Sequence, residues 1–365
     1  MSVQLRPMLA GLPAYVPGRT VPGAIKLASN ETPYPPLPHV LERIAEAAAT
    51  VNRYPDNGAT VLTAALAERY AVAPEQVVPG CGAVQLCEQL AWAYTEPGTS
   101  IVFAWRSFEM YPLLGQLSGA RSVAVPLTPG APGAAPDTHD LDALAAAVDD
   151  TTRLVFVCNP NNPTGTAVRR AALERFLDAV PQGTLVVLDE AYREFVTDPD
   201  VPDGLELMRG RPNVCVLRTF SKAWGLAGLR LGYAIGPERI LDAARAVAVP
   251  LSVTGQAQLA GLVALDHEDL LLARVEDIVA TRSRLVQSLR DLGFDVPDAQ
   301  GNFVWLGLGD ATAAADDRFH EHGVVVRAFP GDGLRISIGE HESVDRVLHV
   351  AALLAPIRPV SRHAE

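Results

Sequence analysis

The chain contains little of what marks several classes of protein. Only two of its 365 residues are lysines, the other basic residues being arginines, and aromatic residues make up 6%. No run of about 18 uninterrupted apolar residues occurs, so we expect no membrane-spanning helix. A formal net charge of −12 without a basic run argues against a nucleic-acid partner.

Cysteines are also few. The four that are present form no CxxC pair and sit in apolar surroundings. This pattern predicts buried, reduced thiols in a cytoplasmic protein, and no metal site is expected. The first 20 residues lack the apolar core of a signal peptide, which agrees with that location.

At 365 residues the chain is long enough for two domains with a sizeable core, and its apolar fraction of 48% is ordinary for a globular enzyme. Short Val-, Leu- and Ile-rich runs alternate with helical patterns, which predicts a mainly parallel sheet covered by helices on both faces. The expected strands begin near residue 77 and then cover 100–104, 122–126, 154–158, 185–188, 214–217 and 231–235. Helices are expected over 38–50, 60–70, 83–94, 141–148, 169–179, 237–247, 257–266 and 268–292.

Domain boundaries follow from changes in composition. Residues 1–38 are rich in proline and glycine and predict an extended arm, followed by a large domain over 39–252. Residues 253–365 are dominated by helical patterns, with strand-like runs at 303–306, 324–326 and 334–338. They predict a smaller α/β domain, which the arm could join.

Three expected strands end in unusual polar groups. An amide, Asn162, follows the first of them, a carboxylate, Asp189, ends the second, and an amine, Lys222, follows the third. Ligands of open parallel sheets bind at the carboxyl ends of the strands, so these groups would meet if the strands are neighbours. Each also has an ordinary explanation: a turn former, a helix cap and a solvated lysine. Their joint placement favours a site.

A phosphate-binding turn is also predicted. Residues 77–83 form a strand, a glycine-containing turn and the start of a helix, whose first N–H groups, at Ala83 and Val84, would face an anion. A dinucleotide fingerprint needs a glycine where Gln85 stands, and no GxxxxGK occurs. The turn therefore suits a single phosphomonoester, with further contacts expected from Thr219, Ser221 and Arg230.

These features together resemble the histidinol-phosphate aminotransferase family, a branch of the fold-type I aminotransferases. The matching segments lie between residues 29 and 339, in the order of the family, and read SNETPYP, NRYPD, GCGAVQL, WRSFEMYP, CNPNNPTGT, VVLDEAYREF, RTFSKAWGLAGLRLGYAIG and GLRISIG. The resemblance implies an α/β fold whose large domain carries a mainly parallel seven-stranded sheet. It also implies pyridoxal 5′-phosphate as the cofactor.

The same resemblance implies roles for individual residues. Lys222 would bind the cofactor covalently and move the proton of the substrate. Asp189 would pair with the pyridine nitrogen, while Asn162 and Tyr192 would bond to the ring oxygen and Phe108 would stack on the ring. The phosphate contacts would come from Ala83, Val84, Thr219, Ser221, Arg230 and Tyr54. Tyr54 is expected to reach the second subunit's phosphate, which implies a homodimer with shared active sites.

Substrate contacts are implied at four positions. Arg335, which would otherwise be a surface arginine on an edge strand, matches the arginine that takes the substrate's acidic group, and Arg327 matches a second arginine of the family. Tyr15 and Asn30 lie in the arm that closes over the substrate. An apolar pocket is expected to be lined by Tyr15, Trp105, Phe108 and Trp224.

Several segments of the sequence narrow the choice of substrate. GCGAVQLC, WRSFEMYP and NRYPDNGAT look most similar to the aromatic amino acid (phenylalanine) aminotransferases of high-GC bacteria. We therefore predict transamination of phenylalanine or tyrosine with 2-oxoglutarate. Histidinol-phosphate aminotransferase and threonine-phosphate decarboxylase activities are alternatives within the family. A non-catalytic, cofactor-sensing regulator is an alternative of another class.

Overall fold

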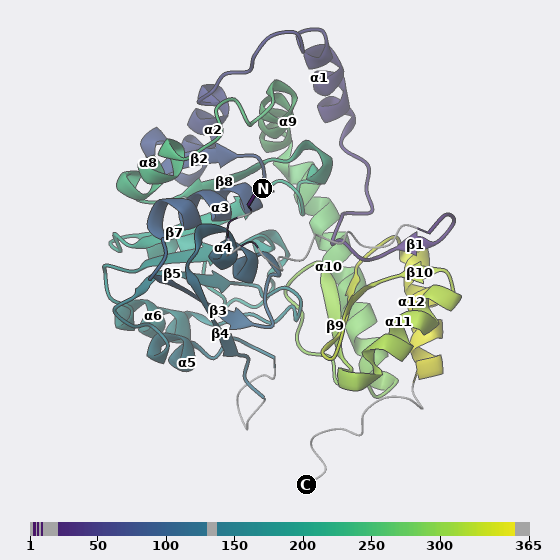
Figure 1. Cartoon of the computed structure of the whole chain (residues 1–365). Coiled ribbons are helices and arrows are strands. Elements are labelled where there is room, and N and C mark those ends of the chain that lie inside the picture. Colours follow the sequence, from purple (N-terminus) through teal and green to yellow (C-terminus); the bar gives the residue numbers. More distant parts are fainter. Residues whose placement is uncertain (1–2, 5, 7–8, 10–20, 130–136, 355–365) are drawn as a thin grey trace.

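A seven-stranded sheet forms the larger part of the computed structural model, which describes residues 3–4, 6, 9, 21–129 and 137–354 (Figure 1). Its strand order is β2-β8-β7-β6-β5-β3-β4, and only β8 runs antiparallel to its neighbours. The strands are β2 (Val77–Gly80), β3 (Ser100–Trp105), β4 (Arg121–Pro126), β5 (Thr152–Cys158), β6 (Leu185–Asp189), β7 (Val214–Thr219) and β8 (Gly232–Ile235). The predicted α/β fold with a mainly parallel seven-stranded sheet is confirmed.

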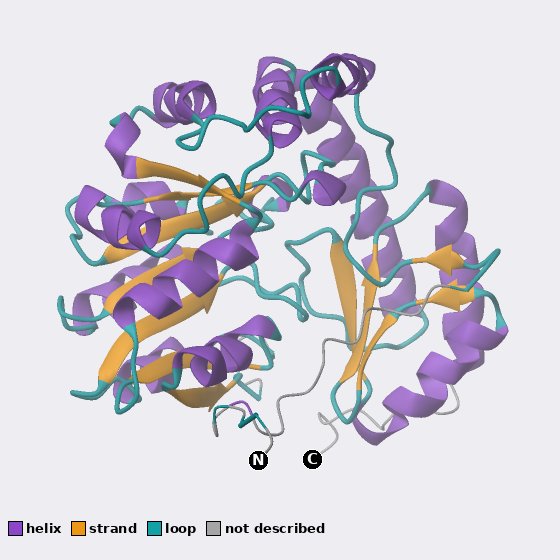
Figure 2. Cartoon of the chain, turned by 45° about the horizontal axis from the view of Figure 1, so that its top comes forward, coloured by secondary structure: helices purple, strands orange, loops and turns teal. Residues whose placement is uncertain are grey.

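Helices cover both faces of this sheet, as Figure 2 shows. Successive residues of β5 alternate between the two layers: Phe156 belongs to one apolar cluster and Val157 to the other. The layer that contains Phe156 is built by α3 (Ala83–Tyr94), α4 (Met110–Ser118) and α8 (Glu238–Ala246). The layer that contains Val157 includes α2 (Thr60–Tyr70), α5 (Leu141–Ala146), α6 (Arg170–Ala179) and α7 (Gly204–Met208).

A second sheet is built from the last third of the chain. It has the antiparallel order β11-β12-β9, formed by β11 (Arg327–Phe329), β12 (Gly333–Ser337) and β9 (Phe303–Gly307). Next to it, β1 (Ile25–Lys26) pairs in parallel with β10 (Val324–Val325), so the expected arm contributes a strand here. The helices of this part are α11 (Thr312–Glu321) and α12 (His341–Leu354).

The helices α9 (Gly255–Asp266) and α10 (Glu268–Asp291) connect the N-terminal helices with the second sheet. The helix α9 packs against α1 (Pro38–Ala48) and α2, and α10 runs from there to the second sheet (Figure 1). Short 3₁₀ helices complete the described elements: Pro74–Gln76, Arg193–Phe195, Ala227–Leu229 and Gly309–Ala311. The expected boundary at residue 252 stays a prediction.

Several elements differ from the sequence expectation. Of the run 324–326, only Val324 and Val325 form a strand, β10, because Val326 lies between β10 and β11, and α4 and α7 were not expected. The sequence of α4 contains Pro112 and Gly115, which usually disfavour helices. Pro112 lies in the first turn, where its missing N–H costs no helical bond, and Gly115 lets β4 approach, since a Cβ there would lie 2.3 Å from Ser122 Oγ.

Within residues 21–129 and 137–354, no helix combines the length and the apolar character needed to cross a membrane.

Candidate active site

The carboxyl ends of β5, β6 and β7 open into a cavity of about 880 Å³. The three strands are neighbours in the sheet, so the groups that follow them converge as predicted. The second sheet and residues 28–31 form the opposite wall. The predicted site residues that line the cavity are Asn30, Ala83, Val84, Phe108, Asn162, Asp189, Tyr192, Thr219, Ser221, Lys222, Arg230, Arg327 and Arg335.

Two predicted residues are not among those that line the cavity. Tyr54 lies between α1 and α2 with 87% of its surface exposed, so its predicted reach into a second subunit stays a prediction. Tyr15 lies outside the described residues.

Lys222 lies in the loop after β7, and its Nζ donates a hydrogen bond to the carbonyl of Ser29 at 3.0 Å. Burial, together with the positive charge of Arg335, lowers the pKa of this amine to about 7, while Glu31 opposes the change. A large fraction of the amine is therefore neutral near pH 7. A neutral amine can act as a nucleophile and as a proton acceptor.

Asp189 ends β6 and is 4% exposed. Its Oδ2 accepts a hydrogen bond from the Tyr111 hydroxyl at 2.8 Å, whereas Oδ1 is buried without a bond of normal geometry to any described residue. Burial raises the pKa of Asp189, and the Tyr111 hydroxyl and the Ala191 N–H oppose this increase. A buried carboxylate oxygen without a donor is costly, so this atom is prepared for a ligand donor.

Aromatic side chains brace this carboxylate. Tyr111, which was not predicted as a site residue, stacks on Phe156 with ring centroids 4.5 Å apart and meets Phe108 edge to face at 5.6 Å. Phe108 and Trp105 line the cavity. The expectation that Trp224 also lines it is wrong, because its Nε1 donates to Glu194 at 3.1 Å and its ring packs on Phe220 in the core.

The start of α3 has the geometry that an anion site requires. Gly82 precedes the helix with φ +79°, and no side chain caps the first turn, so its N–H groups remain available on the side of the cavity. The Arg230 guanidinium lies so close that a Cβ at Gly82 would come within 2.6 Å of Nη2. Gly232 is equally constrained, since its Cβ would lie 2.5 Å from the Ala83 nitrogen. Glycine at these two positions brings a cation against a helix N-terminus.

Arg335 is not a surface residue on an edge strand. It lies on β12, the central strand of the second sheet, and is 7% exposed. One Nη donates to Asn162 Oδ1 and the other donates to the Ala28 carbonyl at 2.6 Å. Both acceptors are neutral, so a carboxylate would be a stronger partner for this guanidinium.

Asn30 joins the arm to the cavity wall. Its Nδ2 donates to the Tyr192 hydroxyl at 3.0 Å, and its backbone N–H donates to Ser337 Oγ at 2.8 Å. Asn302 Nδ2 donates to the Asn30 carbonyl at 3.0 Å. Burial raises the pKa of Tyr192 to about 12, so its hydroxyl keeps its proton at neutral pH. These bonds hold residues 28–31 against Lys222 and Tyr192.

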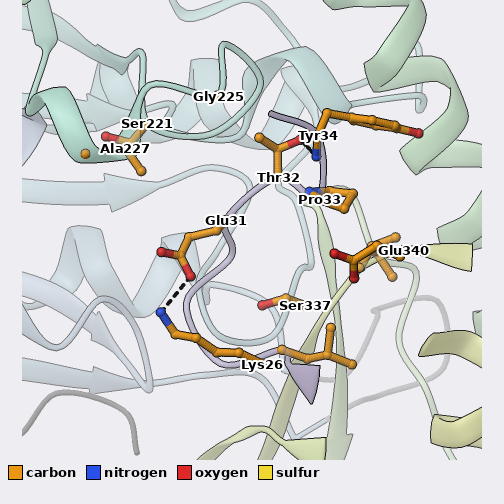
Figure 3. A pocket seen from close by; sticks show the side chains of 14 residues that line it. Lys26, Glu31, Thr32, Pro33, Tyr34, Ser221, Gly225, Ala227, Ser337 and Glu340 are labelled. Atoms are coloured by element: carbon orange, nitrogen blue, oxygen red, sulfur yellow. Dashed lines mark hydrogen bonds and ion pairs between the residues drawn. The ribbon is translucent and has the colours of Figure 1, made fainter. Parts of the chain in front are cut away.

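Behind that wall lies a second cavity of about 370 Å³ (Figure 3). Glu31 lines both cavities and forms an ion pair with Lys26 at 2.8 Å. Lys26 and Glu31 extend from the same short segment, as the figure shows. The segment is therefore a thin partition, with Lys222 on one side and the second cavity on the other.

Comparison with known proteins agrees with this geometry. Residues 22–350 match the family "Aminotransferase class I and II". The chain is 54% identical over 354 residues to the aromatic amino acid aminotransferase of Streptomyces coelicolor, with 96% of this chain and 97% of that protein covered. It is 52% identical to the protein of the same name from Nocardia farcinica, with 96% of this chain and 98% of that protein covered.

A solved structure shares the fold over nearly the full length. It is the histidinol-phosphate aminotransferase from Sinorhizobium meliloti in complex with pyridoxal-5′-phosphate, at a TM-score of 0.88 and 29% identity. The match covers 98% of this chain and 99% of that chain.

Proposed function

Because the chain belongs to the aminotransferase class I and II family, we propose that it transfers the amino group of phenylalanine or tyrosine to 2-oxoglutarate. The chain is an aminotransferase of fold type I, and pyridoxal 5′-phosphate is its cofactor. The observation that carries the reaction is one cavity containing an amine with a pKa of about 7 and a buried carboxylate oxygen without a donor. The substrate class rests on relatives at 52–54% identity that are named for aromatic amino acids.

The residues of the cavity fit the cofactor. Asp189 Oδ1 is placed to accept a hydrogen bond from a protonated ring nitrogen, and the start of α3 with Arg230 fits a phosphate. Lys222 supplies the amine for the covalent bond. When bound, pyridoxal 5′-phosphate supplies an electron sink for the charge that develops at the substrate's Cα.

Each residue then has a definite task. Lys222 accepts the proton of the substrate's Cα, which its pKa of about 7 allows at neutral pH. The carboxylate of Asp189, whose orientation is fixed by the bond from the Tyr111 hydroxyl to Oδ2, would keep the nitrogen of the cofactor's ring protonated. Asn162 and Tyr192 would donate hydrogen bonds to the oxygen on the cofactor's ring.

The substrate is held by groups on the opposite wall. Arg335 exchanges neutral acceptors for the substrate's carboxylate, and that exchange orients Cα toward Lys222. Trp105 and Phe108 give part of the cavity an apolar wall, which suits an aromatic side chain. Asn30 keeps residues 28–31 in place beside the reacting groups.

A homodimer with shared active sites is part of the proposal. Exposure of Tyr54, at 87%, supports its predicted contact with the second subunit's phosphate site. Other large apolar side chains of α1, α2 and the segment between them are also exposed: Leu41, Val51 and Val61. Sedimentation of the cofactor-loaded protein tests this part, and a fully active monomer would contradict it.

Two features of cellular context complete the proposal. The enzyme acts in the cytoplasm, which the buried free thiols of Cys87, Cys158 and Cys215 support. Its chain divides into an arm over 1–38, a large domain over 39–252 and a small domain over 253–365.

Steady-state kinetics with 2-oxoglutarate as the acceptor test the function. Phenylalanine, tyrosine and histidinol phosphate are compared as donors, and the proposal expects a much higher kcat/KM for the two aromatic amino acids. A specificity constant far higher for histidinol phosphate would overturn the substrate class. Release of carbon dioxide without a keto acid would overturn the reaction.

A further inference from the structure

Two arginines lie side by side on the wall opposite Lys222. Arg327 on β11 is the direct partner of Arg335 on β12 in the antiparallel ladder. Directly opposite residues project from the same face of a sheet, with Cβ atoms about 4.5–5.5 Å apart. Both line the cavity of about 880 Å³. A substrate whose carboxylate binds Arg335 therefore places its side chain near Arg327.

The partners of the two arginines differ in charge. Asn162 and Ala28 supply neutral acceptors to Arg335. Arg327 instead donates through Nη2 to both oxygens of Glu109, at 3.1 and 2.9 Å. A carboxylate of the chain itself thus occupies a guanidinium that a second acidic group of a substrate would need.

Glu109 is positioned from the far side of the cavity. It immediately precedes α4, yet its side chain makes no capping bond to that helix. The carboxylate reaches instead across to β11, directly after Phe108 and from the segment that lines the apolar wall. Its position is therefore explained by Arg327 rather than by the helix.

We propose that Glu109 is a specificity-determining residue that neutralises Arg327 and so biases the side-chain subsite toward uncharged rings and against carboxylates and phosphates. This inference rests on the proposed function, because it assigns the subsite of that same reaction. An anionic group of a substrate can bind Arg327 only by displacing Glu109, and the displaced carboxylate stays close enough to repel that anion. An aromatic ring needs no such displacement.

The pair also has to open during a transamination cycle. The acceptor 2-oxoglutarate carries a second carboxylate, so it must enter the subsite that Glu109 occupies. The side chains of Glu109 and Arg327 are 44% and 22% exposed, so Glu109 has solvent into which it can turn. The ion pair consequently weakens the binding of acidic substrates without excluding them.

The decisive variant is Glu109→Gln, which removes the charge at nearly constant shape. Binding of two unreactive acids, glutarate and 3-phenylpropionate, to the cofactor-loaded protein is measured by calorimetry. We expect the ratio of their dissociation constants to shift at least about tenfold in favour of glutarate, a change of about 1.4 kcal/mol. The KM for 2-oxoglutarate should fall in parallel.

A matched control is Glu321→Gln. Glu321 forms an ion pair with Arg318 at 2.9 Å on α11, and neither residue lines the cavity, so the ratio should stay unchanged. If Glu109→Gln does not fold, Arg327→Gln tests the same ion pair through its other member. This change should weaken the binding of glutarate about tenfold relative to that of 3-phenylpropionate.

An unchanged ratio in the folded Glu109→Gln or Arg327→Gln variant would overturn the inference, as would an equal change for both acids. Failure of the proposed function would look different. In that case the unaltered protein would not transaminate phenylalanine at all, whereas a failed inference leaves that activity intact.

Discussion

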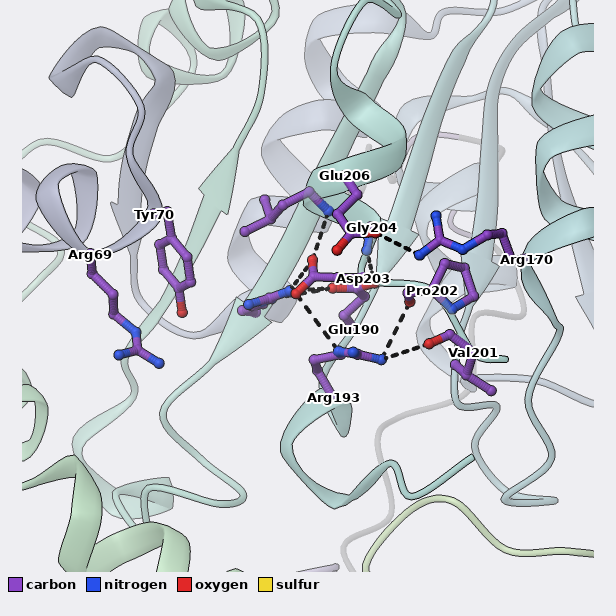
Figure 4. A network of polar contacts seen from close by, with 12 residues as sticks. Arg69, Tyr70, Arg170, Glu190, Arg193, Val201, Pro202, Asp203, Gly204 and Glu206 are labelled. Carbon is purple, nitrogen blue, oxygen red and sulfur yellow. Dashed lines mark hydrogen bonds and ion pairs between the residues drawn. The ribbon is translucent and has the colours of Figure 1, made fainter. Parts of the chain in front are cut away.

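Asp189 and Glu190 are consecutive carboxylates at the end of β6, and both are buried, at 4% and 2% exposure. Asp189 belongs to the cavity side of the sheet edge. Glu190 lies away from the cavity, in a polar network with Gly204, Asp203 and Arg218. Figure 4 shows Glu190 beside Asp203 and Gly204. Two neighbouring residues of the same charge thus meet opposite surroundings.

The difference lies in how completely each carboxylate is satisfied. Glu190 Oε1 accepts from the Gly204 N–H at 2.7 Å, and Oε2 accepts from Arg218 at 2.8 Å. Burial raises the pKa of both carboxyl groups, but only at Glu190 does a guanidinium oppose this increase. A fully paired buried carboxylate stabilises the fold locally. A carboxylate with an unpaired buried oxygen retains an uncompensated desolvation penalty, which a hydrogen bond from a ligand can offset.

The largest effect is expected on the cavity side, at Lys222. Changing Lys222→Ala removes the nucleophile and the proton acceptor, so turnover should fall at least about 10³-fold and the absorbance specific to the covalently bound cofactor should be lost, while the fold stays intact. Lys26→Ala is the matched control, because Lys26 is the other lysine and pairs with Glu31 at the second cavity. Near-normal transamination in Lys222→Ala would refute the assignment.

Asp189→Asn should have the next largest effect. The amide cannot hold the ring nitrogen in its protonated state, so kcat should fall roughly 10²–10³-fold in a folded protein. Glu190→Gln, measured in parallel while folded, should lose less than about fivefold, since Glu190 does not reach the cavity. Equal losses in kcat would break the comparison between the two carboxylates.

Glu190 should matter for stability instead. Glu190→Gln leaves the buried Arg218 with less compensating charge, so the unfolding free energy should fall by about 3 kcal/mol in urea titrations. Asp203 continues to pair with Arg218 at 2.7 Å and moderates the loss. The double change Glu190→Gln with Arg218→Met should recover part of it. If Asp189→Asn lowered the unfolding free energy as much as Glu190→Gln does, this prediction would be contradicted.

The smallest effect concerns pH. Since Lys222 has a pKa of about 7, its neutral fraction rises about tenfold between pH 6 and pH 8 and then levels off. The rate at which the apoprotein binds the cofactor covalently should follow this curve, measured by absorbance in stopped flow. A free lysine amine, with a pKa near 10.4, serves as the reference and should show no plateau there. A rate that keeps rising beyond pH 9 would mean that burial does not lower the pKa.

The sequence predicted the strands of the site and the polar residues at their ends well, because both depend on local patterns. Apolar runs identified β5, β6 and β7. The polar residues at the ends of these strands, Asn162, Asp189 and Lys222, lie together at the carboxyl edge of the sheet. The glycine turn before α3 was likewise visible in the local order of residues. Parallel strand order then brings these pieces together.

The partners of these groups were less predictable. Tyr111 bonds to a residue 78 positions away, and Glu109 to one 218 positions away, and no local spacing encodes either contact. The expected place of Trp224 in the cavity failed because two residues after Lys222 the chain has already turned into the core. Such side-chain directions depend on tertiary packing rather than on local sequence.

The attachment of residues 25–30 to the second sheet sets an order of assembly during synthesis. Ala28 and Arg335 bond across 307 positions, and Asn30 and Ser337 across the same separation. At ribosomal rates of roughly 5–20 residues per second, Arg335 is made about 15 to 60 s after Ala28. The seven-stranded sheet, complete at Ile235, can form within that interval. The partition beside Lys222 therefore gains its bonds to Arg335 and Ser337 last, and a chain that stops before β12 keeps only the other contacts of this segment, such as the pairing of β1 with β10.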